Sequence, residues 1–97
     1  YTMRIAGFDW DEGNRNKCGK HGVSCKEIEA LFARTPRVFP DMAHSHHEQR
    51  WRAIGTTENG IYVFVVFTLR PTDDKKPLLR PISARYMHKK EVLHYEQ

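Results

Sequence analysis

The chain has few cysteines, no long apolar run and no basic leader followed by an apolar stretch. Its two cysteines, Cys18 and Cys25, are too few for a disulfide scaffold, and their spacing matches no zinc motif. The longest apolar stretch, residues 61–67, is far too short to cross a bilayer. These absences predict a protein of the reducing cytoplasm that has no membrane anchor.

The 97 residues are enough for one small domain with its own core. Apolar residues make up 39% of the chain, and the aromatic residues are five Phe, four Tyr and two Trp, so a wholly disordered chain is excluded. Met3 is expected to be the native start, with Tyr1 and Thr2 as foreign residues, so that a single domain covers residues 3–97.

Positive charge is in excess and is unevenly spread. Sixteen Lys and Arg face twelve Asp and Glu. Residues 1–60 hold nine basic and eight acidic groups, whereas residues 61–97 hold seven and four. A basic C-terminal part attracts polyanions, and nucleic acid is the most common of these.

The N-terminal third predicts a strand and two helices. The strand covers residues 3–8. The carboxylates that follow favour a helix start, and the first helix is expected to end at Gly22, where glycine can adopt a left-handed conformation. Ser24 and Glu27 form a capping box for a second helix, which Pro36 stops.

The rest of the chain predicts four strands and a closing helix. Their expected ranges are 37–39, 50–54, 62–69 and 80–85 for the strands, and 87–95 for the helix. Asn59-Gly60 indicates a tight connection between the second and third of these strands. The predicted fold class is α+β, an antiparallel sheet with two N-terminal helices packed on it and a short C-terminal helix.

Two groups of basic residues are candidate site residues. Lys20 and His21 end the first helix, where they could neutralise a phosphate and transfer a proton, or simply cap the helix dipole. Arg50 and Arg52 project on one face of their strand, and Arg85 with Ser83 closes the last strand. If these strands lie close together, the arginines form a cationic patch that suits a phosphate. The alternative is a solvated sheet face with ion pairs to Glu48 or Glu58.

Two further clusters have weaker claims on function. His44, His46 and His47 lie within four residues, a spacing unlike that of a zinc site, so no functional metal is expected. Lys89 and Lys90 on the last helix could contact an RNA backbone or face water, with Glu91 offsetting part of their charge.

Five sequence segments occur in an order that resembles the BrnT family of bacterial type II toxins. They are FDWD at 8–11, KHGVS at 20–24, RAIG at 52–55, VVFT at 65–68 and ISAR at 82–85. The resemblance implies a RelE-like ribonuclease that cleaves RNA without a metal or other cofactor. It also implies a BrnA-like antitoxin that carries a DNA-binding domain, inhibits the toxin and, with it, represses the operon.

By position, the resemblance assigns the family's functional candidates to Lys20 and His21, to Arg52, and to Ser83 with Arg85. The expected reaction is attack of a ribose 2′-hydroxyl on the adjacent phosphorus. A different hypothesis is a non-catalytic module that binds the antitoxin and acts only at the operator. A metal protein built on the histidine loop is the least favoured reading.

Overall fold

The computed structural model describes residues 4–42, 47–73 and 75–96, which form one sheet and three helices. The expected native start at Met3 therefore lies outside the described residues. The strands are β1 (Gly7–Phe8), β2 (Arg37–Pro40), β3 (Arg50–Thr56), β4 (Tyr62–Arg70) and β5 (Leu78–Tyr86). The helices are α1 (Glu12–Gly19), α2 (Cys25–Ala33) and α3 (Lys89–Glu96).

The strands form a mixed sheet in the order β1-β5-β4-β3-β2. The pairs formed by β2, β3, β4 and β5 are antiparallel, as predicted, but β1 runs parallel to β5. The wholly antiparallel sheet expected from the sequence is therefore wrong at this one edge. The connection from β1 to β5 spans most of the chain, so no local turn signal reveals its direction.

The first strand and first helix are both shorter than predicted. β1 has only two residues, because its pairing with β5 covers only Gly7 and Phe8. α1 ends at Gly19 and not at Gly22, although Gly22 does take the expected positive φ of 88°. Two glycines in eight helical residues weaken α1, and its early end is consistent with their low helix propensity.

Both helices carry the caps that hold their first turns. Asp11 caps α1, and its side chain accepts a hydrogen bond from the backbone N–H of Asn14. The predicted capping box of Ser24 and Glu27 is confirmed on α2. Thr35 follows α2 with a φ of 58°, so the chain leaves the helix before Pro36, as expected.

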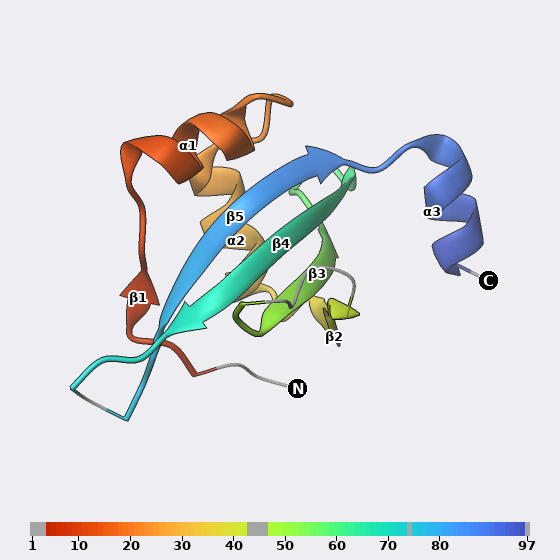
Figure 1. Cartoon of the computed structure of the whole chain (residues 1–97). Coiled ribbons are helices and arrows are strands. Elements are labelled where there is room, and N and C mark those ends of the chain that lie inside the picture. The colour runs from red at the N-terminus through yellow and green to blue at the C-terminus, as the bar shows by residue number, and fades with distance from the viewer. Residues whose placement is uncertain (1–3, 43–46, 74, 97) are drawn as a thin grey trace.

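The core lies between the sheet and the pair α1 and α2. Figure 1 shows both helices on one side of the sheet, with α3 beyond the end of β5. Ile28 and Leu31 of α2 pack against a fully buried strand layer that includes Val65 and Phe67 of β4. β4 lies in the middle of the sheet, as its apolar sequence predicted. No helix of the described residues is long and apolar enough to cross a membrane.

The β3–β4 hairpin is confirmed, and α3 follows the last strand. Gly60 takes a φ of 78°, and its N–H donates to the carbonyl of Thr57 within the connecting loop. α3 starts two residues later and ends one residue later than predicted, and none of its residues is buried. It contacts the sheet through a few side chains near its ends, which matter for the site below.

Candidate nucleic-acid interface

Every arginine that lies in a strand projects from the side of the sheet opposite α1 and α2. We call this side the open face. The cross-strand register places six arginines on it: Arg37, Arg50, Arg52, Arg70, Arg80 and Arg85. Because paired residues of neighbouring strands share a face, the register alone fixes this arrangement. One sheet face therefore carries six of the nine arginines of the chain.

A β-bulge in β5 brings Arg80 to the same face as Ser83. Ser83 pairs with Val66 and Pro81 with Phe67, so that Ile82 is the additional residue. Simple alternation would put residues 80 and 83 on opposite faces. The additional residue of a bulge changes that alternation locally. Sequence reasoning missed Arg80 for this reason, although Pro81 beside the bulge was an available signal, since proline inside a sheet is typical of bulges.

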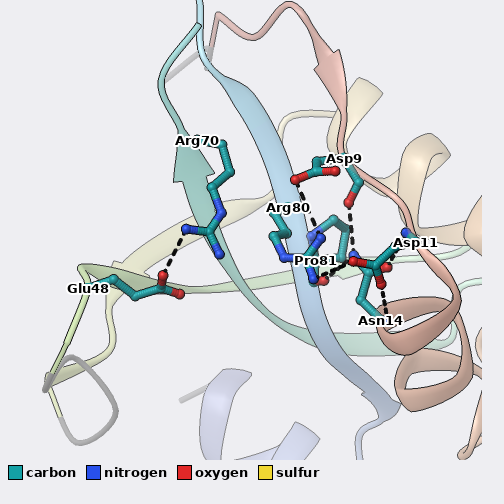
Figure 2. A network of polar contacts seen from close by, with 7 residues as sticks. All are labelled: Asp9, Asp11, Asn14, Glu48, Arg70, Arg80 and Pro81. Atoms are coloured by element: carbon teal, nitrogen blue, oxygen red, sulfur yellow. Dashed lines mark hydrogen bonds and ion pairs between the residues drawn. The ribbon is translucent and has the colours of Figure 1, made fainter.

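Arg80 is held by two carboxylates at the start of α1. Its guanidinium lies 2.7 Å from Asp11 Oδ2 and 3.4 Å from Asp9 Oδ2, and both contacts are drawn in Figure 2. The backbone hydrogen bond from Asn14, followed by the bond from Arg80, lowers the pKa of Asp11. Arg80 therefore has a structural role, because it joins β5 to the beginning of α1.

Asn14 anchors the same junction from inside. Its Nδ2 donates to the backbone oxygens of Asp9 (2.9 Å) and Pro81 (2.8 Å), and its Oδ1 accepts from the backbone N–H of Asp11 (2.7 Å). The side chain is buried, and all three contacts can be followed in Figure 2. A buried amide satisfied in this way fixes α1 against β5.

Glu48 lies between two other arginines of the open face. Its carboxylate is 3.5 Å from Arg50 Nε and 3.2 Å from Arg70 Nη1, and the Arg70 contact is drawn in Figure 2. From the sequence, this ion pair of Arg50 with Glu48 was the alternative to a phosphate-binding patch, and the ion pair is present. Glu58 instead pairs with Arg34, at 3.8 Å.

Arg85 makes a fork of two hydrogen bonds with Glu91 at the start of α3. Its Nη1 donates to Oε1 (2.7 Å) and its Nη2 to Oε2 (2.8 Å). The guanidinium also lies 4.9 Å from the ring centroid of Phe64. The bond from Arg85, followed by the backbone N–H of His88, lowers the pKa of Glu91 to about 2. Glu91, expected to offset Lys89 and Lys90, is thus the partner of Arg85.

Arg52 lies at the centre of the open face. It is exposed, and its side chain has no hydrogen bond or ion pair with any residue in the described ranges. Val66 separates it from Ser83 in the same cross-strand row, and Arg85 lies one row further along. Two strand spacings (~9.6 Å) and two residues (~6.6 Å) put the Cα atoms of Arg52 and Arg85 ~12 Å apart. Two arginine side chains can span this gap.

Lys20 and His21 lie in the turn between α1 and α2, away from Arg52. Both are exposed. The hydroxyl of Tyr86 donates to the carboxylate of Glu27 in α2 (3.0 Å) and lies 3.3 Å from the carbonyl oxygen of Gly22, so this turn is attached at the end of β5. Tyr86 alternates with Arg85, so the turn is attached on the helix-covered side of the sheet. The structure thus brings Arg50, Arg52, Ser83 and Arg85 together and keeps Lys20 and His21 around the end of β5.

The remaining candidates lie at the margin of the open face or outside the described residues. Lys89 and Lys90 are exposed in the first turn of α3, directly before Glu91. His44 and His46 fall outside the described residues, and His47 is exposed. Within the described ranges, no group of three His, Cys, Asp or Glu residues is arranged to hold a metal ion.

Sequence reasoning missed Arg37 as part of this region, and on the last helix it considered Lys89 and Lys90 but not Tyr95. The guanidinium of Arg37 lies 5.6 Å from the ring centroid of Tyr95 in α3. An isolated arginine on a four-residue strand gives no periodic signal, and a long-range contact between residues 37 and 95 leaves no local pattern. The alternation of Arg37 with the apolar Val38 was the one available indication that Arg37 faces away from the core.

The comparisons with known proteins identify one family. A family model described as the ribonuclease toxin BrnT of type II toxin–antitoxin systems matches residues 10–91. No curated protein matches the chain. The match covers α1, α2, β2 to β5 and the first turn of α3, and so includes every arginine of the open face.

Proposed function

The chain belongs to the BrnT family of ribonuclease toxins of type II toxin–antitoxin systems, and on this premise we propose that it is a metal-independent endoribonuclease. The observation that carries the proposal is the convergence of arginines on the open face, with Arg52 exposed at its centre. Guanidinium groups suit phosphate oxygens because their donors form a planar fork. The proposed overall arrangement is that of a RelE-like toxin.

The proposed reaction is an internal transfer of the phosphoryl group. The ribose 2′-oxygen forms a bond to the adjacent phosphorus, and the bond from phosphorus to the 5′-oxygen breaks. The proton of the 2′-hydroxyl passes to a base, and a proton is delivered to the departing 5′-oxygen. The products are a 2′,3′-cyclic phosphate end and a 5′-hydroxyl end.

Arg52 and Arg85 would hold the equatorial oxygens of the phosphorane, with Ser83 next to Arg85 on the same face of β5 and in the row of Arg52. Protein cations at these positions can neutralise the growing charge without a metal ion. Glu91 occupies the fork of Arg85, so a phosphate must displace this carboxylate to use both donors.

His21 is proposed to transfer protons, and Lys20 to contact the phosphate or assist the departing oxygen. The turn that carries Lys20 and His21 is attached at Tyr86, on the helix-covered side of the sheet. To contact a phosphate on the open face, the two side chains must therefore extend around the edge of β5. Arg50, Lys89 and Lys90 would contact the RNA backbone on either side of the scissile group. By cleaving messenger RNA in this way, the enzyme would inhibit translation.

A protein antitoxin is the expected partner of a type II toxin. We propose a BrnA-like protein whose DNA-binding domain brings the complex to the operator, so that this chain contacts DNA only through the antitoxin. The alternative is a non-catalytic co-repressor. The ion pairs of Arg50, Arg80 and Arg85 favour it, because these arginines already have carboxylate partners and so do not form a fully open cationic site.

Cleavage of purified RNA in EDTA separates the two functions. Activity that leaves 2′,3′-cyclic phosphate ends supports the ribonuclease. Inertness on both free RNA and translating ribosomes supports the co-repressor. In cells, Arg85→Ala is expected to restore growth without loss of the fold, and a folded variant that stays fully toxic would remove Arg85 from the site.

A further inference from the structure

A cavity of about 570 Å³ lies where the end of the sheet meets the end of α2 and the underside of α3. Its volume is typical of sites for small ligands. Its lining includes two arginines, two tyrosines, a threonine and an isoleucine: Arg34, Arg37, Tyr62, Tyr95, Thr56 and Ile54. No residue assigned to the reaction lines this cavity.

Flat side chains dominate one wall of the cavity. The rings of Tyr62 and Tyr95 meet edge to face, with centroids 5.7 Å apart and planes at 68°. The guanidinium of Arg37 lies over the ring of Tyr95. The hydroxyl of Tyr62 donates to Glu96, which restrains the Tyr62 ring. Aromatic rings and guanidinium planes are the surfaces on which unpaired bases stack.

The cavity continues the open face. Ile54 follows Arg52 by two residues on the same face of β3, a step of ~6.6 Å. Ile54, Phe64 and Arg85 share one cross-strand row, and Tyr62 lies in the next row. A strand of RNA whose phosphate rests between Arg52 and Arg85 would therefore place a neighbouring nucleotide at the mouth of the cavity.

We propose that this cavity binds one unpaired nucleobase of the RNA, next to the scissile phosphate. The proposal rests on RNA being the substrate, as argued above. The base would stack on the ring of Tyr95, which Tyr62 meets edge to face, and the hydroxyl of Thr56 offers a hydrogen bond to the edge of the base. Arg34 and Arg37 would meet the flanking phosphates at the cavity rim.

The first test uses the unaltered protein and a single-stranded RNA decamer with 2′-O-methyl groups throughout, which cannot be cleaved. One base at a time is removed to leave an abasic site, and affinity is measured by fluorescence anisotropy. Loss of one stacked base is expected to weaken binding about 5- to 150-fold at a single position. If no single position matters by more than about twofold, the proposal is wrong.

The second test assigns that position to the cavity. Tyr95→Ala is expected to weaken binding of the intact decamer by the same factor and to remove the effect of the abasic site. Tyr95→Phe keeps the ring and should bind within about twofold of the original chain. Leu93→Ala, an exposed change on the same helix, is the matched control and should also bind normally.

The outcomes distinguish this proposal from the proposed function. Base-dependent binding that requires Tyr95, without any cleavage of unmodified RNA, supports the base site and contradicts the ribonuclease. Normal RNA binding by a folded Tyr95→Ala variant contradicts the base site whether or not RNA is cut. If that variant instead loses affinity only for the antitoxin, the cavity is a protein-binding site and the proposal is wrong.

Discussion

Replacement of Arg52 by Ala separates catalysis from stability more cleanly than any other change on the open face. Arg52 is exposed and has no partner in the described part of the chain, so its loss should change the free energy of unfolding by no more than ~0.5 kcal/mol. In a domain of this size that corresponds to a shift of only ~2–4 °C in Tm. The fold should therefore survive.

The same change should strongly reduce the rate of cleavage. Loss of one donor aimed at the charge of a transition state costs at least ~100-fold, which equals ~2.7 kcal/mol of barrier. Loss of one phosphate contact should also reduce the slope of log affinity against log salt by ~0.7. Arg52→Lys keeps the charge but not the planar fork, so it should recover part of the salt slope and little of the rate.

The assay is single-turnover cleavage of a short RNA in EDTA, with thermal melting of each variant measured in parallel. Arg15→Ala is the matched control, because it removes the same charge from an exposed position on α1. The control should cleave within about twofold of the unaltered chain. A folded Arg52→Ala variant that cleaves within threefold of the unaltered chain would refute the assignment of Arg52 to the phosphate.

Three further predictions concern the framework around the site. Asn14→Ala leaves two backbone carbonyls without their donor, so it should lower the free energy of unfolding, measured by urea melts, by about 2–4 kcal/mol. The exposed control Asn16→Ala should lower it by under ~1 kcal/mol. Equal losses in the two variants would contradict the role of Asn14 as an anchor. The pKa of Glu91 is about 2, so its link to Arg85 stabilises the fold above about pH 4.5 and is lost as the pH falls toward 2. A carboxyl NMR titration should show this low midpoint and its rise in Arg85→Ala; an unchanged midpoint would contradict the fork. Burial raises the pKa of Cys18 to about 11, so iodoacetamide should label this cysteine only after denaturation. Rapid labelling of Cys18 in the native protein, assigned by peptide mapping to separate it from the half-buried Cys25, would show that α1 opens.

The elements with strong local signals could be predicted from the sequence. The capping box of Ser24 and Glu27 defined the start of α2, and the Asn59-Gly60 turn identified the β3–β4 hairpin. Alternation placed Arg50 and Arg52 on one face, where the structure has them. In each of these cases the information lies within a few residues of the feature it specifies.

Features that depend on distant contacts could not be predicted in this way. The parallel pairing of β1 with β5 joins residues about 70 positions apart. The bulge at Ile82 changes the face of Arg80, and the adjacent Pro81 indicates an irregular strand without fixing which residue is the additional one. The fork between Arg85 and Glu91 depends on the path that the chain takes from β5 into α3, which neither segment encodes alone.

The central claim is that the arginines of the open face, and not Arg15 of α1 or Arg34 directly after α2, hold the scissile phosphate. Guanidinium NMR of the full chain with an uncleavable 2′-O-methyl RNA tests it most directly. The Nε resonances of Arg52 and Arg85 should both shift on binding, with release of Glu91 from its fork. Shifts confined to Arg15 and Arg34, with Arg52 and Arg85 unchanged, would contradict the claim.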